Sequence, residues 1–175
     1  WVRYSMNDYG WVYRAVIQGP PIGKGRPRHT KEGRVYTPKR TVDWEKSAAY
    51  LMGGWWHEAP YEGKVGVRVY SYAVRPGRLL RKKDAPGPVW KGTTPDVDNV
   101  AKSVLDAIQM AGVIRQDNQV VYLEVRDMFA EKDGVARVEL ELFPIQDPAA
   151  ELTSGKVGVS WADDAPSGEQ CVASL

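Results

Sequence analysis

Two aspartates, Asp96 and Asp98, lie one residue apart in the stretch TTPDVDNVAKSVLDAIQMAG, where apolar residues begin to recur at helical spacing. One carboxylate at a helix start is common, because it accepts unpaired backbone N–H groups and interacts favourably with the helix dipole. A second carboxylate within reach repels the first, so the pair needs positive surroundings or solvent. The pattern therefore leaves three explanations open: a basic side chain, a bound metal ion, or exposure to water.

Comparison with known metal-binding patterns narrows which ion could bind here. A calcium-binding EF-hand loop needs Gly at its sixth position and Glu at its twelfth, but counting from Asp96 these positions hold Ala101 and Ala107. A structural zinc site lacks ligands, because the chain contains only two histidines and one cysteine. An oxygen-only site for Mg²⁺ or Mn²⁺ stays open, although a D-x-D pair alone is a weak signal.

Lys102 and Asp117 are the further residues that metal-dependent chemistry would use. Lys102 follows Asp98 by one helical turn, either as a partner in an exposed ion pair or as a catalytic cation. Asp117 comes after the helix, which has about 13 residues and spans about 20 Å. Asp117 can therefore reach Asp96 only through a particular tertiary arrangement or from a second subunit, and the sequence does not decide between them. Asp106, one turn beyond Lys102, either orients that lysine or lies in solvent.

Hydrophobic periodicity predicts the elements that position these residues. The predicted strands are 11–19, 64–74, 119–130 and 134–143, and the predicted helices start at Thr41 and at 97. The buried face of the first helix is predicted to contain Trp44, Ala48, Leu51, Met52 and Trp55. The Asp-Gly pair in the turn EKDG predicts that the last two strands form a hairpin.

This order of elements predicts an α+β fold with the succession β–α–β–α–β–β. We expect a compact single domain over residues 1–146, in which two helices pack on a small mixed sheet. Residues 147–175 are rich in Pro, Ala, Ser, Gly and acids and show no apolar periodicity, so they are predicted to be a mobile, acidic tail.

The net charge of +2 hides a basic half and an acidic half. Residues 1–95 contain 18 Lys/Arg and 7 Asp/Glu, whereas residues 96–175 contain 6 and 15. This asymmetry indicates a bound polyanion and a bound cation, or two solvated faces of opposite sign. Two Gly- and Pro-rich loops, 20–40 and 75–95, are too polar for the core, and their guanidinium groups suit phosphate. The predicted phosphate contacts are Lys24, Arg26, Arg28, Lys31, Arg34, Lys39, Arg40, Arg81, Lys82 and Lys83.

Cysteine content and hydropathy bear on the compartment. A single cysteine, Cys171, excludes an internal disulfide and fits a reducing environment. No apolar run approaches the roughly 18 residues that are needed to cross a bilayer. We therefore expect a cytoplasmic protein without membrane contact. The chain begins with Trp1 rather than Met, which favours a fragment of a longer protein.

The segment PDVDNVAKSVLDAIQMAGVIRQDNQVV resembles the RusA-type Holliday junction endonucleases. Their pattern is D-x-D-N, a Lys four residues after the second Asp, a helix ending near Ala-Gly, and then Asp-x-Gln-Val/Ile. The matching residues are Asp96, Asp98, Asn99, Lys102, Asp106, Ala111, Gly112, Asp117, Gln119 and Val120. The upstream segment GPPIGKGRPRHTKEGRVYTPKRTVDWE is similar to the basic N-terminal region of phage-type members, so the resemblance covers roughly residues 11–143. Gln116 departs from it, since many members have Asp there, and so does Thr94, where phage-type members often have Lys or Arg.

The resemblance implies that Asp96, Asp98 and Asp117 bind Mg²⁺, or Mn²⁺, and that Lys102 supports catalysis. It also implies a homodimer, of bacterial or phage origin, that cuts four-way DNA junctions by two symmetric incisions in recombination and repair, leaving 5′-phosphate ends. The alternative is a module of the same fold that binds branched or single-stranded DNA without cutting it. A nuclease acting on flaps or replication forks is a third, weaker interpretation.

Overall fold

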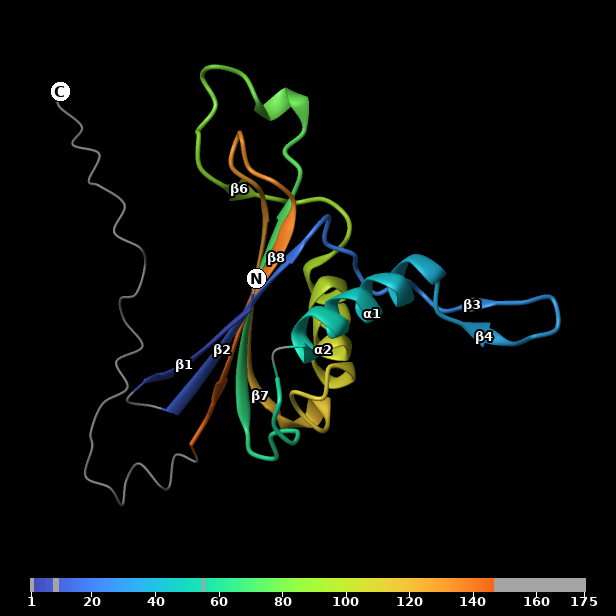
Figure 1. Cartoon of the computed structure of the whole chain (residues 1–175). Helices are drawn as coiled ribbons and strands as arrows, with labels where there is room; N and C mark the ends of the chain where they lie inside the picture. The colour runs from blue at the N-terminus through green and yellow to red at the C-terminus, as the bar shows by residue number, and fades with distance from the viewer. Residues whose placement is uncertain (1, 8–9, 55, 147–175) are drawn as a thin grey trace. The chain divides into compact units, whose positions relative to one another are not determined.

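The computed structural model describes residues 2–7, 10–54 and 56–146, which form a mixed sheet and two helices (Figure 1). In chain order the elements are β1 (Val2–Asn7), β2 (Gly10–Gln18), β3 (Arg28–His29), β4 (Val35–Tyr36), α1 (Lys39–Gly53), β5 (Val65–Ala73), η1 (Gly77–Leu79), β6 (Val89–Trp90), α2 (Val97–Met110), η2 (Asp117–Gln119), β7 (Val120–Phe129) and β8 (Arg137–Pro144). The predicted α+β fold and the order of its main elements are confirmed. The predicted tail, 147–175, lies outside the described residues.

The main sheet has six strands in the order β1-β2-β8-β5-β7-β6. β5 and β7 run parallel, and the other neighbouring pairs run antiparallel. Parallel neighbours require a crossover connection, and α2 supplies it between β5 and β7. This topology places both ends of α2 beside the two ends of β7, where the predicted site residues lie.

Alternating side chains of the sheet form the core beneath the two helices. The inward positions of β5 and β8 are buried and mostly apolar, with Ser71 as the polar exception, as period-2 alternation requires when one face is covered. The residues that form this core include Val65, Val67, Val69, Val138, Leu140 and Leu142 from the sheet and Val104, Ala107 and Ile108 from α2. The hydroxyl of Tyr13 on β2 donates to the carbonyl of Met52 at 2.8 Å, which ties the sheet to the end of α1.

The predicted hairpin around EKDG is wrong. The turn forms, with the Gly134 amide donating to the Glu131 carbonyl, but β7 and β8 do not pair with each other. Instead β5 lies between them, parallel to β7 and antiparallel to β8. The Asp-Gly signal describes the local turn and contains no information about β5, which ends 58 residues before that turn, at Ala73 against Glu131.

α1 begins earlier than predicted. Its first residue is Lys39 and its N-cap is Pro38, whereas Thr41 lies within the first turn with a buried side chain. A proline at this point is compatible with a helix start, because its missing N–H would have had no partner in the helix. Trp55, predicted on the buried face, lies outside the described residues.

The buried face of α1 is also rotated relative to the prediction. Ala48 and Met52 are buried and Trp44 packs against the core, as predicted, but Leu51 is 43% exposed. Glu45 takes a place on the buried face instead. A buried carboxylate needs a partner, and the chain provides one from the basic loop that precedes the helix.

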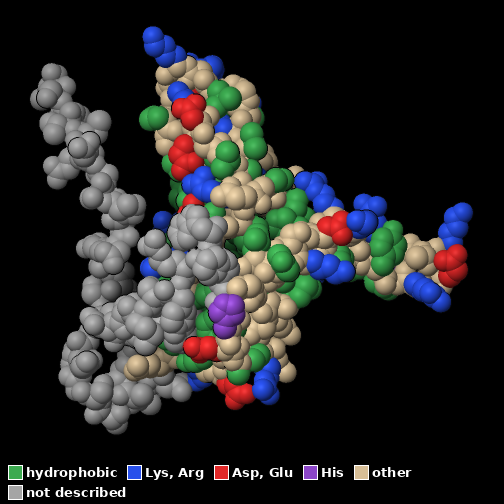
Figure 2. Space-filling view, in the orientation of Figure 1, with side chains coloured by type: hydrophobic (Ala, Val, Ile, Leu, Met, Phe, Trp, Pro, Cys, Tyr) green, Lys and Arg blue, Asp and Glu red, His purple; other side chains and the backbone are tan. Residues whose placement is uncertain are grey.

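The basic loop 20–40 contains a hairpin that the sequence did not reveal. β3 and β4 pair in the register Arg28↔Tyr36 and His29↔Val35, around a turn in which Gly33 has a φ of 80°. A positive φ strains residues that carry a Cβ, so glycine suits this turn. Figure 1 shows the hairpin projecting away from the sheet and helices, and Figure 2 shows Lys and Arg side chains along this projection.

Candidate active site

Asp96 and Asp98 lie at the start of α2, and both side chains are exposed. Asp96 is the N-cap residue, and its carbonyl accepts the amides of Asn99 and Val100, both at 3.1 Å. Its carboxylate makes no capping hydrogen bond. The Asp96 carboxylate is therefore not used to cap the helix and remains available to a ligand.

Asp98 forms an ion pair with Lys102 one turn further along α2, with Nζ at 2.9 Å from Oδ2. The hydrogen bond from Lys102 lowers the pKa of Asp98 below its usual value, so this carboxylate stays ionised. Of the three explanations for two adjacent carboxylates, a basic partner is thus present for Asp98. Both side chains remain about 60% exposed, so an incoming cation can compete with the lysine.

Asp117 is the first residue of η2, beyond the far end of α2, and is exposed. Gln119 holds this turn in place. Its side-chain oxygen accepts the amides of Arg115 and Gln116 at 2.9 Å. Its nitrogen donates to the carbonyls of Tyr61 at 2.7 Å and Gly63 at 2.9 Å. The Gln of the Asp-x-Gln pattern therefore fastens the Asp117 turn to the loop before β5.

Gln116 also has a structural task in this turn. Its side chain accepts the backbone amide of Gln119, and the two residues form a reciprocal capping box. The departure at position 116 therefore replaces a carboxylate with a group that stabilises η2.

Within one chain the three aspartates are not brought together. α2 has 14 residues, so its ends are about 20 Å apart. Among the described residues there is no group of three or more His, Cys, Asp or Glu side chains that could hold a metal ion. Of the two routes that the sequence left open for Asp117, an arrangement within one subunit is therefore not seen, and contribution from a second subunit remains.

If Asp117 binds metal as the resemblance implies, Gln119→Ala is expected to lower cleavage by about 10- to 100-fold, the range typical of residues that orient metal ligands. The reason is the loss of all four hydrogen bonds that hold the Asp117 turn. Initial cleavage rates on a labelled junction measure the effect. Gln109→Ala, at an exposed position of α2, is the matched control and should cleave normally. Equal rates for both variants would show that the position of Asp117 does not matter.

Lys24 connects the basic loop to both helices. Its ammonium binds Glu45 of α1 at 2.8 Å and also forms an ion pair with Asp106 of α2. Burial alone would lower the pKa of Lys24, but the hydrogen bonds to Asp106 and Glu45 outweigh burial and raise it. Asp106 thus binds Lys24 rather than Lys102. Lys24, predicted as a phosphate contact, therefore already has two carboxylate partners in the free protein.

The start of the basic loop packs directly on the entry to α2. The Lys24 amide donates to the Asn99 carbonyl at 2.7 Å. A Cβ placed on Gly23 would lie 2.6 Å from that of Pro95, so only glycine allows this approach. The basic loop therefore leaves the body of the protein next to Asp96 and Asp98.

The other predicted phosphate contacts lie on two exposed segments. Arg26, Arg28, Lys31, Arg34, Lys39 and Arg40 surround or lie on the β3–β4 hairpin, and Arg81, Lys82 and Lys83 lie on the loop between η1 and β6. Two of them have local acidic partners: Lys39 binds Asp43 at 2.6 Å, and Arg81 binds Asp84 at 3.3 Å. Such exposed pairs are weak and exchange readily for phosphate.

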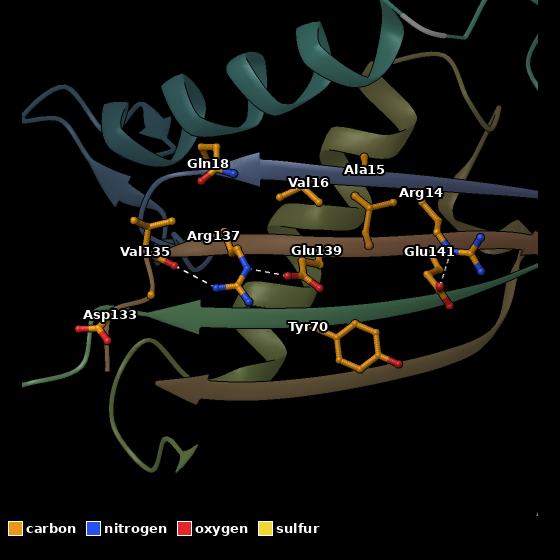
Figure 3. Close-up of a pocket in the computed structure, with 12 residues that line it drawn as sticks. Arg14, Ala15, Val16, Gln18, Tyr70, Asp133, Val135, Arg137, Glu139 and Glu141 are labelled. Atoms are coloured by element: carbon orange, nitrogen blue, oxygen red, sulfur yellow. Dashed lines mark hydrogen bonds and ion pairs between the residues drawn. The ribbon is translucent and has the colours of Figure 1, made fainter. Parts of the chain in front are cut away.

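The sheet face opposite the helices is charge-balanced and is a poor candidate for DNA. Figure 3 shows Arg14 beside Glu141 and Arg137 beside Glu139. These residues line an open hollow of about 460 Å³. The ion-pair distances are 2.6 Å and 2.5 Å. Because each guanidinium faces a carboxylate on a neighbouring position of the sheet, this face offers little net attraction to phosphate.

Comparisons with known proteins identify a family. The family model described as "Endodeoxyribonuclease RusA" matches residues 18–142. The chain is 29% identical over 128 residues to the uncharacterized protein YqaN of Bacillus subtilis, covering 69% of this chain and 89% of that protein. It is 27% identical over 118 residues to the crossover junction endodeoxyribonuclease RusA of Aquifex aeolicus, covering 67% of this chain and 79% of that enzyme.

The matched region includes every residue placed in the candidate site. It runs from the end of β2 to β8 and so contains α2, η2 and the β3–β4 hairpin. None of the helices that the structure describes is long and apolar enough to cross a membrane. The resemblance inferred from the D-x-D-N and Asp-x-Gln patterns is confirmed: the chain belongs to the RusA family of endodeoxyribonucleases.

Proposed function

We propose that this protein is a metal-dependent endonuclease that resolves four-way DNA junctions by two symmetric incisions. One observation carries the proposal: the exposed pair Asp96 and Asp98, with Lys102 beside it, lies where the basic hairpin segment leaves the body of the protein. This arrangement places groups suited to phosphate chemistry next to groups suited to phosphate binding. Family membership supports the same conclusion.

Asp96, Asp98 and Asp117 are the proposed ligands of Mg²⁺, for which Mn²⁺ can substitute. The carboxylate oxygens fit a hard cation that keeps several waters and shares phosphate oxygens. When bound, such an ion lowers the pKa of a coordinated water and neutralises charge on the leaving oxygen. Hydrolysis that breaks the bond between phosphorus and the 3′ oxygen leaves a 5′-phosphate end.

A two-fold dimer would bring the third ligand to the other two. Asp117 lies at the opposite end of α2 from Asp96 and Asp98 in the same chain. If two copies pack with α2 and β7 antiparallel, the Asp117 end of one faces the Asp96 end of the other, twice. The same symmetry provides two sites for two incisions.

The free edge of β7 suits such a dimer. Within the described residues, β6 covers this edge only at Met128 and Phe129, which leaves 120–127 without a neighbouring strand there. Val121 and Leu123 on this segment are 53% and 44% exposed. Unpaired edges with apolar side chains favour association, and antiparallel pairing with a second copy would satisfy the backbone groups.

Lys102 is proposed to stabilise negative charge during cleavage. In the free protein its ammonium is held by Asp98, at 2.9 Å, on a flexible side chain. A cation that binds Asp98 would release the ammonium within one helical turn of the reacting phosphate. Lys102 can then donate to a phosphate oxygen as charge develops there.

Junction affinity is expected to fall steeply with salt, because the proposed contacts are to phosphates. Each phosphate contact adds about 0.7–0.9 to the log–log slope of affinity against salt concentration. Arg26 and Arg28 are exposed. Replacing both by Ala should reduce the slope by the contribution of two phosphate contacts, about 1.4–1.8. Titrations at several salt concentrations in EDTA measure it. An unchanged slope would indicate instead that DNA contacts the segment containing Arg81, Lys82 and Lys83.

The function is tested by incubating the full chain with a mobile four-way junction in Mg²⁺ and in EDTA. Labelling opposite strands separately shows whether the two incisions are symmetric. Fork and flap substrates in the same gel separate junction resolution from a broader branched-DNA nuclease. We expect paired incisions in the junction that require Mg²⁺. Tight binding without cleavage in Mg²⁺ or Mn²⁺ would instead favour a binding module of the same fold.

A further inference from the structure

Lys91, just after β6, is a lysine buried in the protein, and it rests against Asp127 of β7. The side chains of Lys91 and Asp127 are only 2% and 7% exposed, and they form an ion pair. Lysine and aspartate are seldom buried this completely unless they are paired, because burial removes their hydration. A pair buried at this depth needs a structural or functional reason.

All three hydrogens of the Lys91 ammonium have partners. Besides Asp127, the ammonium donates to the carbonyl of Thr93 at 2.7 Å and to that of Pro95 at 3.0 Å. The other oxygen of Asp127 accepts the hydroxyl of Ser71 on β5, at 2.9 Å. The Lys91 amide also donates to the Asp127 carbonyl at 3.1 Å. The lysine is thus fixed to β5 and β7 through Asp127, and its ammonium binds the backbone of the segment that follows it.

The segment that Lys91 binds, residues 92–95, leads directly into the candidate metal ligands Asp96 and Asp98. Residues 92–95 connect β6 to α2, and Asp96 follows Pro95 directly as the N-cap residue. Gly92, Thr93 and Thr94 are exposed, so these residues have little packing of their own. The two hydrogen bonds from Lys91 to these carbonyls therefore fix the position of the backbone immediately before Asp96.

We propose that Lys91 is a positioning residue for the proposed metal site, which it acts on through the carbonyls of Thr93 and Pro95. It is buried beneath the segment and does not touch DNA. Asp127 and Ser71 anchor the lysine to the sheet, so that the rigid β5–β7 pair determines the position of Asp96 and Asp98. Residues behind metal ligands commonly change metal affinity by 10–100-fold when they are removed. This inference rests on the proposed metal-dependent function.

A purely structural role would give a different pattern of effects. Removing one partner of a buried ion pair leaves an uncompensated charge and destabilises the whole protein, wherever the pair lies. Neutralising both partners together removes that penalty. The double variant Lys91→Met/Asp127→Asn therefore keeps an acceptor for Ser71 and has no buried charge, but it loses the grip on residues 93–95.

Arg75 provides a matched control. It is 4% exposed, and its guanidinium likewise holds backbone carbonyls of a neighbouring loop, those of Ala85 at 2.6 Å and Gly87, together with Ala130 at 2.9 Å. The Ala85 and Gly87 carbonyls belong to the loop before β6, that of Ala130 follows β7, and none of the three belongs to the segment that enters α2. Arg75→Met should destabilise the protein without changing its affinity for metal.

The experiment compares the unmodified protein, Lys91→Met, the double variant and Arg75→Met. Mg²⁺ binding is measured by calorimetry without DNA, amide exchange over residues 92–100 in EDTA by mass spectrometry, and the melting temperature by circular dichroism. We expect the double variant to melt near the unmodified protein, yet to bind Mg²⁺ about tenfold or more weakly and to exchange faster over 92–100. If Lys91→Met does not fold, the double variant carries the comparison alone.

Three outcomes would overturn the proposal. Unchanged Mg²⁺ affinity and exchange in the double variant would make the pair a structural element only. An equal loss of Mg²⁺ affinity in Arg75→Met would attribute the effect to general loosening. No Mg²⁺ binding by the unmodified protein would remove the metal-dependent function itself, a failure visible before any variant is compared.

Discussion

Asp98→Asn is expected to abolish junction cleavage while folding and DNA binding persist. Asn keeps nearly the same shape but removes the charge of a proposed metal ligand. A bound ion would activate the attacking water, so its loss should lower the cleavage rate by at least about 100-fold. Junction affinity measured in EDTA should stay equal or rise, because a carboxylate facing phosphate repels it. Melting temperature, affinity in EDTA and cleavage in Mg²⁺ should be measured on one preparation.

Asp43→Asn is the matched control for this variant. Asp43 lies near the start of α1, exposed, and pairs with Lys39 at i,i+4 spacing, as Asp98 pairs with Lys102 on α2. Both substitutions therefore remove an exposed ion pair near a helix start, which contributes little to stability. Only Asp98→Asn should stop cleavage. Retained cleavage in Asp98→Asn would contradict the assignment of this carboxylate to the metal.

The sequence predicted the elements of the fold because their signals are local. The inward alternation of β5 and β8 and the apolar stripe of α2 each follow from a few neighbouring residues. The pairing of strands does not, because it depends on which segments meet in space. That is why a correct Asp-Gly turn at 133–134 led to a wrong hairpin, with β5 inserted between the two strands it joins.

The site was predicted where its residues are contiguous and was incomplete where they are not. Asp96, Asp98 and Lys102 share one helix start, and the structure pairs two of them as their spacing allows. The partners of Lys24 could not be predicted, since Glu45 and Asp106 lie 21 and 82 residues away. In the same way Gln119 was recognised as part of a pattern, but its contacts to the carbonyls of residues 61 and 63 were not.

The buried pair of Lys91 and Asp127 did leave one signal in the sequence. On β7, Leu123, Val125, Asp127 and Phe129 lie opposite the inward positions of β5, so a single acid interrupts an apolar series. A carboxylate at such a position needs a buried cation or several donors. The same reasoning applies to Glu45 on the buried face of α1. Charged residues at core positions of a periodic pattern therefore mark tertiary contacts, although they do not name the partner.

Combining two inactive variants is expected to restore cleavage, if the metal site is shared between subunits. In homodimers of Asp98→Asn or Asp117→Asn, both sites lack a ligand. In the mixed dimer, one site lacks two ligands, whereas the other combines Asp96 and Asp98 of one chain with Asp117 of its partner and is complete. We expect this dimer to nick the junction on one strand, at about half the rate of initial incision by the unmodified dimer, because one of two equivalent sites remains.

Co-expression with two different affinity tags isolates the mixed dimer, and strand-specific labels distinguish a nick from full resolution. The matched control combines Asp96→Asn with Asp98→Asn. Since both substitutions fall at the same end of α2, each site of that dimer still lacks one ligand, and it should stay inactive.

The contrast between the two mixed dimers tests the geometry directly. If Asp117 instead approached Asp96 within one chain, each chain of either mixed dimer would carry a defective site and neither would cut. Cleavage by the first and not by the second requires that the two ends of α2 meet across a two-fold axis.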